Sequence, residues 1–164
     1  MIEVLYAMIP AYVANMTPVL ARGLPGKARL DFGFSLRGEP LLGANKTWKG
    51  FLIGTALGTF VGVVLSNLYW PFVFSAFWWS FLVSFGALTG DAVKSFFKRR
   101  MKVKSGRPWI PFDQLDFVVG AFAFGSIVYF PGWAAVLAVG LLSVLGHIAV
   151  NHAAFYLGIR KEKW

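Results

Sequence analysis

The sequence has no cysteine, only two histidines, and only seven acidic residues among 164. Without cysteine, the chain can form neither a disulfide, nor a thiolate nucleophile, nor a cysteine-based zinc site. Charged residues make up 14% of the chain, well below the roughly 25% of an average soluble domain. Hydrophobic residues make up 57%, and a soluble protein of this size would expose much of that content as apolar patches. The composition therefore predicts an integral membrane protein with a single domain over residues 1–164.

Five apolar segments are candidates for membrane spans, since a spanning helix needs about 20 apolar residues. They are Val4–Ala21, Gly50–Leu68, Phe72–Thr89, Phe112–Phe130 and Trp133–Leu157. Glu3, rather than a basic residue, precedes the first segment, so we expect this segment to be a retained helix and not a cleaved signal peptide. The sequence thus predicts an all-α integral membrane protein with five transmembrane helices.

The basic residues indicate how these helices are oriented. All sixteen lysines and arginines fall within residues 22–49, 94–107 and 160–163, and with five spans these three regions share one side of the membrane. Basic loops face the cytoplasm in most membrane proteins, so we expect the N-terminus outside and the C-terminus in the cytoplasm. The same rule explains the net charge of +9 without a nucleic-acid partner. We therefore expect a multi-pass protein of the cell membrane whose two cytoplasmic loops carry the site.

Two aspartates begin the fourth predicted span, at the cytoplasmic interface. Asp113 and Asp116 are three residues apart, so on a helix they share a face and can bind one divalent ion. The alternative is a helix-capping role, with Asp113 as the N-cap and Asp116 near the positive end of the helix dipole. Oxygen ligands without a histidine or cysteine cluster favour Mg²⁺ over zinc.

A second group of polar residues follows Gly90, at the end of the third predicted span. If the helix continues past Gly90, one stripe of its surface carries a carboxylate and then basic and hydroxyl groups. These residues are Asp91, Lys94, Ser95 and Lys98, with Arg99 beside them. Such a stripe can hold a metal ion at one end and phosphates at the other. A solvated basic helix, in which Asp91 pairs with Lys94 or Ser95, explains the same spacing.

The segment GANKTWKG (residues 43–50) precedes the second predicted span. It lacks the G-x-x-x-x-G-K-[ST] pattern of a P-loop. A Lys-Thr pair before a helix can nevertheless present a charge and a hydroxyl to phosphate oxygens at the helix N-terminus. The span that follows carries glycine at positions 50, 54, 58 and 62, which favours close packing against a neighbouring helix. A lipid groove or a dimer contact is the alternative for this stripe.

These segments resemble the phosphatidate cytidylyltransferase (CDP-diacylglycerol synthase) family. SFFKR (95–99) and DQLD (113–116) are similar to its S-x-x-K-R and D-x-x-D motifs, and NKTWKG (45–50) to its K-T-x-x-G segment. The stretch 100–112 departs from the bacterial pattern, which has K-D after K-R and H-G-G shortly before D-x-x-D. The short chain and five spans look most like the archaeal branch, the CDP-archaeol synthases.

The resemblance implies a Mg²⁺-dependent nucleotidyltransferase of membrane phospholipid biosynthesis. CTP would react with a lipid phosphate, for the archaeal branch 2,3-bis-O-geranylgeranyl-glycerol 1-phosphate, to give CDP-archaeol and pyrophosphate. The implied catalytic residues are Asp91, Asp113, Asp116 and Lys98, and the three aspartates would bind the metal. The implied nucleotide- and phosphate-binding residues are Asn45, Lys46, Thr47, Lys49, Lys94, Ser95, Lys98 and Arg99.

Two other functions fit parts of the sequence. A CTP-dependent polyprenol or phytol kinase would differ only in the phosphorus atom that is attacked. A lipid-binding scaffold or a transporter would catalyse no reaction. Transporters place ionisable residues inside their spans, whereas here the spans contain no lysine or arginine and the carboxylates lie at their ends. That distribution argues against transport.

Overall fold

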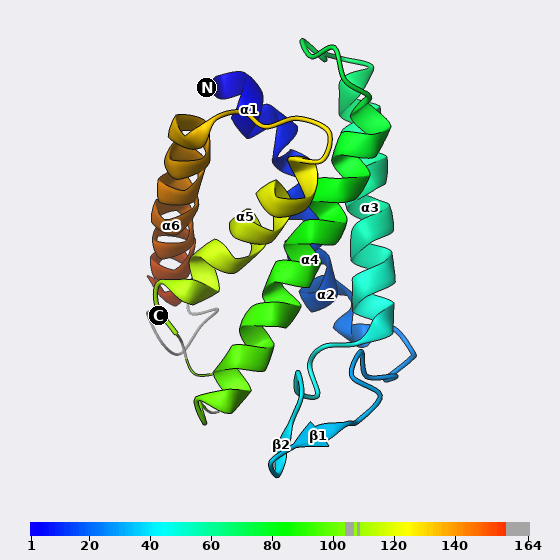
Figure 1. Ribbon diagram of the computed structural model, residues 1–164, viewed down its shortest axis with the longest axis vertical. Coiled ribbons are helices and arrows are strands. Elements are labelled where there is room, and N and C mark those ends of the chain that lie inside the picture. The colour runs from blue at the N-terminus through cyan, green and yellow to red at the C-terminus, as the bar shows by residue number, and fades with distance from the viewer. Residues whose placement is uncertain (104–106, 108, 157–164) are drawn as a thin grey trace.

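The computed structural model describes residues 1–103, 107 and 109–156, which form a largely helical bundle (Figure 1). The helices are α1 (Ile2–Ala7), α2 (Ile9–Leu20), α3 (Trp48–Ser66), α4 (Ala76–Arg100), α5 (Phe112–Gly125) and α6 (Trp133–Tyr156). A 3₁₀ turn (Ala21–Gly23) follows α2, and a hairpin of β1 (Ser35–Leu36) and β2 (Glu39–Pro40) precedes α3. This hairpin departs from the all-α prediction. The predicted end of the last span at Leu157, Lys104 and the basic tail 158–164 lie outside the described residues.

The described loops gather at the two ends of the bundle (Figure 1). The turns that join α3 to α4 and α5 to α6 lie near α1 at one end. The β-hairpin and the C-terminal end of α4 lie at the opposite end. The loop before α3 and the basic C-terminal end of α4 are therefore at the same end of the molecule, as the predicted topology requires.

The first predicted span is two helices joined at Met8, so α1 and α2 together occupy one of five helical segments. The break lies two residues before Pro10. Proline has no backbone N–H, and its ring clashes with the carbonyl four residues earlier in a continuous helix. Pro18, by contrast, lies inside α2.

Two of the predicted span boundaries are wrong. The third helix starts at Ala76 rather than Phe72, where the Ser75 side chain caps it by accepting a hydrogen bond from Trp78 N–H. The fourth helix, α5, ends at Gly125, five residues before the predicted end. Beyond it, N–H groups of residues 127–129 bond back to the carbonyls of Phe124 and Gly125 in a tight turn. With 14 residues, α5 is about 21 Å long, shorter than the roughly 30 Å hydrocarbon core of a bilayer.

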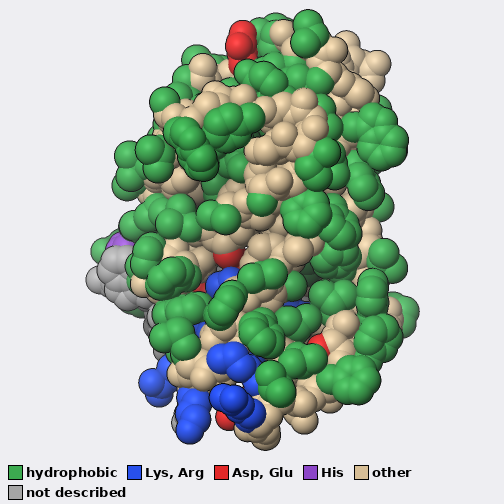
Figure 2. All heavy atoms as spheres, in the orientation of Figure 1, with side chains coloured by type: hydrophobic (Ala, Val, Ile, Leu, Met, Phe, Trp, Pro, Cys, Tyr) green, Lys and Arg blue, Asp and Glu red, His purple; other side chains and the backbone are tan. Residues whose placement is uncertain are grey.

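Within the described part of the chain, α3 is the one helix that is both long and apolar enough to cross a membrane. Residues Trp133–Ala149 of α6 form a shorter apolar stretch. The visible face of the molecule is mostly hydrophobic, and lysine and arginine side chains gather at one end (Figure 2). Large hydrophobic side chains are exposed in the structure, among them Leu68 (79% exposed) and Ile127 (73% exposed). A surface of this kind is typical of a protein that contacts lipid.

The glycine stripe of α3 packs against α2 and α4. A Cβ atom added at Gly58 would lie 2.3 Å from Ser84 Oγ and 2.6 Å from Pro10 O, and one at Gly62 would lie 2.0 Å from Ser80 Oγ. No side chain larger than hydrogen fits at such distances, so the stripe permits close approach of the three helices. The packing interpretation of this stripe is therefore confirmed.

Gly58→Ala is expected to destabilise the protein by about 1–3 kcal/mol, because the added methyl group forces α3 away from its neighbours. Gly146→Ala in α6 is the matched control. No described atom lies within 4 Å of a Cβ added there, so this change should be neutral or stabilising by about 0.5–1 kcal/mol. Thermal unfolding of the purified variants in detergent measures the difference. Equal stability of the two variants would contradict the packing role.

Candidate active site

The site lies where α4 and α5 cross in direct backbone contact. A Cβ atom at Gly90 would lie 2.1 Å from Asp116 O, and one at Gly120 would lie 2.1 Å from Gly86 O. Glycine at the crossing lets the two backbones touch. Asp91, next to Gly90, is thereby brought beside Asp116 of the other helix. The condition set for the stripe after Gly90 is met, since α4 extends past the predicted span end at Thr89 to Arg100.

Three carboxylates surround one ammonium group at this crossing. Lys94 Nζ lies 2.8 Å from Asp113 Oδ1, 2.9 Å from Asp116 Oδ2 and 3.3 Å from Asp91 Oδ1. The side chains of Asp116 and Lys94 are only 4% and 15% exposed. The three predicted metal ligands therefore converge on a single positive charge.

Two further lysines complete this group, which we call the charge cluster. Lys46 Nζ forms an ion pair with Asp91 Oδ2, and Lys98 Nζ lies 3.0 Å from Asp113 Oδ2. The cluster consists of Lys46, Asp91, Lys94, Lys98, Asp113 and Asp116. Three ammonium groups balance three carboxylates, so the cluster has no net charge.

The Asp113 carboxylate accepts hydrogen bonds both from the lysines of α4 and from the segment before α5, but it does not cap the helix. Its Oδ2 atom accepts a hydrogen bond of 2.6 Å from Trp109 N–H, in the segment before the helix. The N-cap of α5 is Pro111, and no side chain caps this helix end. The capping interpretation of Asp113 is therefore wrong, and its carboxylate is oriented toward the lysines of α4.

Asp91 and Lys94 lie beyond the predicted span Phe72–Thr89, and each stabilises the charge of the other. Burial alone would raise the pKa of the Asp91 carboxyl, but Lys46 and Lys94 hold that pKa below its ordinary value. Burial alone would lower the pKa of Lys94, but Asp116 and Asp91 raise it above its ordinary value. Both groups are therefore ionised at neutral pH.

Asp31 organises the loop that carries Lys46. It is 6% exposed, and its carboxylate accepts hydrogen bonds from Gly33 N–H (3.0 Å) and Leu42 N–H (2.9 Å). The two ends of the loop also pair, since Leu30 N–H donates to Lys46 O at 2.8 Å. Sequence reasoning missed Asp31. An aspartate two residues before a glycine is typical of an Asx turn, and that signal could have identified it.

Asp31→Asn is expected to destabilise the loop by about 1–3 kcal/mol at pH 7, because a buried acceptor of backbone N–H groups loses its charge. Burial raises the pKa of Asp31, but the N–H groups of Leu42 and Gly33 lower it below its ordinary value of 3.8. Its contribution to stability is therefore complete above that value and is lost as the pH falls through the folded-state pKa. Thermal unfolding should show a smaller difference between wild type and Asp31→Asn at about pH 3 than at pH 7.

Glu39→Gln, in the same loop, is the control for this change. Both variants remove one negative charge, but Glu39 accepts its hydrogen bond, from the Arg100 guanidinium, through its backbone carbonyl and not through its carboxylate. The difference between wild type and Glu39→Gln should stay small at both pH values. A pH-independent loss of stability in Asp31→Asn would contradict the assigned role of the carboxylate.

Arg100 links the end of α4 to the β-hairpin through hydrogen bonds. Its guanidinium donates hydrogen bonds to Pro40 O (2.7 Å), Glu39 O (3.1 Å) and Leu36 O, and it lies 5.2 Å from the centre of the Phe96 ring. Sequence reasoning did not single out this residue, because a basic run at a helix end is explained by the positive-inside rule alone.

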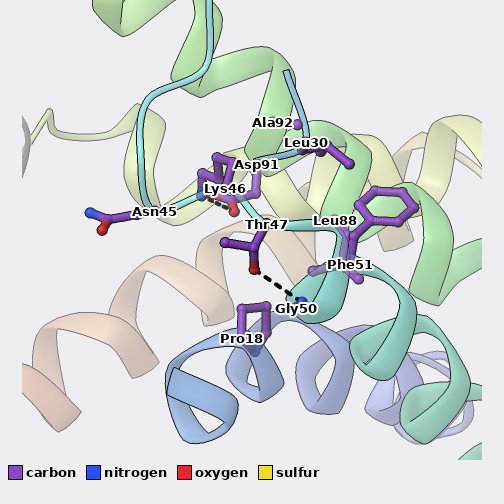
Figure 3. Close-up of a pocket in the computed structure, with 10 residues that line it drawn as sticks. All are labelled: Pro18, Leu30, Asn45, Lys46, Thr47, Gly50, Phe51, Leu88, Asp91 and Ala92. Atoms are coloured by element: carbon purple, nitrogen blue, oxygen red, sulfur yellow. Dashed lines mark hydrogen bonds and ion pairs between the residues drawn. The ribbon is translucent and has the colours of Figure 1, made fainter. Parts of the chain in front are cut away.

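A small pocket lies beside the charge cluster, between α3, α4 and the loop (Figure 3). We call it the Lys46 pocket. Its volume is about 30 Å³, and its lining includes Lys46, Thr47 and Asp91. Thr47 is the N-cap of α3, with Oγ1 accepting a hydrogen bond of 3.1 Å from Gly50 N–H. Among the described residues, the Thr47 hydroxyl proton has no acceptor, so this hydroxyl can donate to a bound oxygen. The Asn45 side chain points away from Asp91 (Figure 3).

A larger, basic pocket adjoins the first. It has a volume of about 270 Å³ and shares Asn45 and Thr47 with the Lys46 pocket. Lys27, Arg29 and Lys49 supply its charge. Ligand pockets commonly have volumes of about 300–1,000 Å³, so the Lys46 pocket alone is too small for a nucleotide. Lys27 and Arg29 were missed, since their positions in a polar loop give no sequence signal.

The other predicted residues lie outside the charge cluster. Ser95 follows Lys94 in α4 and is 7% exposed. A Cβ atom at Gly43 would lie 3.9 Å from Arg99 Nε, so Arg99 lies against the loop. Lys49 Nζ donates a hydrogen bond to Leu24 O. The structure thus brings predicted residues of the loop, α4 and α5 together in the charge cluster. Ser95, Arg99 and Lys49 are not part of that cluster.

The described residues contain no group of three acidic or histidine side chains spaced as metal ligands. The oxygens of Asp91, Asp113 and Asp116 instead surround Lys94 Nζ. The donors are carboxylate oxygens arranged around one cation, and oxygen donors of this kind suit Mg²⁺. Their chemistry fits a divalent ion if the Lys94 ammonium group withdraws.

Comparisons with known proteins agree over nearly the whole chain. Residues 1–164 match the CarS-like family of CDP-archaeol synthases. A relative in Thermofilum pendens, named CDP-archaeol synthase, is 42% identical over 96% of this chain and 78% of its own length. One of the same name in Thermococcus gammatolerans is 38% identical over 98% of this chain and 94% of its own length.

A solved structure also resembles this protein throughout its length. It is described as an intramembrane enzyme for archaeal membrane lipid biosynthesis, and it has a TM-score of 0.82 at 36% identity. The likeness covers 92% of this chain and 93% of that one. The family prediction made from three short motifs is confirmed. The chain belongs to the CDP-archaeol synthase family.

Proposed function

We propose that this protein transfers the CMP moiety of CTP to an isoprenoid diether glycerol phosphate. The acceptor would be 2,3-bis-O-geranylgeranyl-glycerol 1-phosphate (unsaturated archaetidic acid), and the products CDP-archaeol and pyrophosphate. Membership of the CDP-archaeol synthase family supports this reaction. The observation that carries it is the charge cluster, in which residues of the loop, α4 and α5 meet beside a basic pocket.

The proposal places the basic end of the molecule in the cytoplasm, with five helical segments in the membrane and the N-terminus outside. The apolar surface (Figure 2) and the positions of the basic loops support this orientation. CTP would then reach the charge cluster from the water, while the lipid phosphate stays anchored in the bilayer. The two substrates can meet only at such an interface.

The reaction needs no nucleophile from the protein. An oxygen of the lipid phosphate attacks the α-phosphorus of CTP, and the bond from that phosphorus to the oxygen of pyrophosphate breaks. The protein then has to position two anions against each other and reduce their repulsion. Lys46, Lys94 and Lys98 are the ammonium groups in place for this, and the Thr47 hydroxyl can donate to a phosphate oxygen.

We further propose that Asp91, Asp113 and Asp116 hold Mg²⁺ when CTP binds. Bound Mg²⁺ would supply positive charge against the triphosphate and polarise the phosphorus–oxygen bonds. The neutrality of the charge cluster supports this proposal, because a highly anionic nucleotide requires more positive charge than the cluster has. Lys94 would exchange its carboxylate partners for phosphate oxygens.

The test uses purified protein, the geranylgeranyl diether phosphate and CTP labelled at either the α- or the γ-phosphorus. Label from the α-phosphorus should appear in the lipid, together with one pyrophosphate for each lipid, and EDTA should stop the reaction. Label from the γ-phosphorus in the lipid would instead identify a kinase. Absence of label from any lipid acceptor would favour the scaffold function.

A further inference from the structure

An apolar groove with a volume of about 660 Å³ lies between α3 and α4. It extends from Trp48 to Val63 on α3 and from Phe77 to Phe85 on α4. We call it the α3/α4 groove. The fifteen helical steps from Trp48 to Val63 correspond to about 22 Å, more than the roughly 15 Å of one leaflet of the hydrocarbon core. A ligand that fills this groove must be long, narrow and apolar.

Both walls of the groove are suited to hydrocarbon. On α4, Phe77, Phe81 and Phe85 form a ladder of nearly parallel rings, with centroids 6.5 Å and 6.1 Å apart. On α3, the hydroxyl groups of Thr55 and Thr59 donate to backbone carbonyls of their own helix at 2.9 Å and 2.7 Å. These hydroxyls therefore require no polar partner from a bound molecule.

One end of the groove lies next to the site. Phe51 lines both the α3/α4 groove and the Lys46 pocket. Trp48, at the same end of the groove, has a buried indole Nε1–H with no hydrogen-bond partner among the described residues. A buried donor without a partner is costly. This donor therefore indicates a ligand with an acceptor oxygen next to an apolar chain.

We propose that the α3/α4 groove holds one isoprenoid chain of the lipid phosphate and that Trp48 donates a hydrogen bond to an oxygen of its glycerol backbone. The proposal rests on the proposed function and names the part of the protein that selects the acceptor. If an isoprenoid chain lies in the groove with the lipid headgroup at the Phe51 end, the phosphate lies near Lys46 and Asp91. The shared lining residue Phe51, which places one end of the groove beside the site, favours this occupant over a second copy of the protein.

The test narrows the groove without disturbing the core. Ala56 is exposed and lines the groove, so Ala56→Trp obstructs it. Two acceptors are compared, the geranylgeranyl diether phosphate and the same headgroup with two hexyl chains. The apparent KM for the long lipid should rise at least about tenfold. The KM for the hexyl lipid and for CTP should stay within about twofold of wild type. Ala123→Trp, on an exposed position of α5, is the control.

Trp48→Phe tests the hydrogen bond separately, because it keeps an aromatic ring and removes the N–H. The KM for both lipids should rise about tenfold, since both have the same glycerol oxygens, while the KM for CTP should not change. An equal rise in the KM for CTP would contradict a specific role of Trp48 in lipid binding.

Several outcomes would overturn the proposal. Ala56→Trp could raise the apparent KM for both lipids equally, or it could leave both KM values unchanged. It could also change the oligomeric state in light scattering without changing lipid preference, which would assign the groove to a second copy. Wild-type protein that transfers CMP to neither lipid would contradict the proposed function itself. If wild type transfers CMP to both lipids but Ala56→Trp does not raise the KM for the long lipid selectively, only the proposed role of the groove is contradicted.

Discussion

Asp116→Asn should lower kcat/KM for CMP transfer by roughly 10³-fold while the protein stays folded and inserted in the membrane. The Asp116 side chain is 4% exposed, and its Oδ2 atom lies 2.9 Å from Lys94 Nζ. Asparagine has nearly the same shape and can still accept the hydrogen bond from Phe117 N–H. It removes one of the three negative charges around Lys94, and with it a proposed Mg²⁺ ligand.

The measurement is the transfer of label from the α-phosphorus of CTP to lipid, at saturating and at limiting CTP. Glu3→Gln is the control, because Glu3 is an exposed carboxylate in α1, at the other end of the bundle (Figure 1). Size-exclusion chromatography in detergent shows whether the variant remains folded. An Asp116→Asn protein as active as wild type would remove Asp116 from the catalytic machinery.

Lys94→Met should be the most destabilising change in the charge cluster. It leaves the three carboxylates without the ammonium group that separates them, and breaking a buried ion pair costs about 3–5 kcal/mol. Added Mg²⁺ should raise the Tm of Lys94→Met more than that of wild type, since the carboxylates would no longer bind Lys94. CMP transfer should be lost in either case.

The thermal measurement needs no substrate, so it tests the metal-binding proposal independently of activity. Lys102→Met is the matched control, because Lys102 is exposed just beyond the end of α4. Its Tm should not respond to Mg²⁺ more than that of wild type. An equal response of Lys94→Met and wild type to Mg²⁺ would contradict the assignment of the three aspartates as metal ligands.

The parts of the site that depend on helical spacing could be predicted from the sequence. The shared stripe of Asp91, Lys94 and Lys98 follows from helical spacing once the helix continues past Gly90, as α4 does. The stripe of glycines in α3 also indicated close packing by its spacing alone. Local patterns of this kind do not depend on the partner helix, which is why they can be recognised without a structure.

The pairing between elements could not be predicted. Lys94 was assigned to phosphates, whereas in the structure it lies among three carboxylates, two of them on α5. That position depends on the backbone contact at Gly90 and Gly120, which no pattern within one helix encodes. The ion pair between Lys46 and Asp91 joins residues 45 positions apart. The roles of these residues in the reaction stay predictions.

The neutrality of the charge cluster also has a kinetic consequence. Opposite charges in equal number produce little field at a distance, so the cluster itself cannot attract CTP from solution. Under the proposed function, the nucleotide would be attracted instead by the basic residues of the adjoining pocket, such as the exposed Lys27 and Arg29. Their attraction is screened beyond about 8 Å at physiological ionic strength. Added salt should therefore slow the association of CTP, while the rate of the transfer step between buried groups changes little.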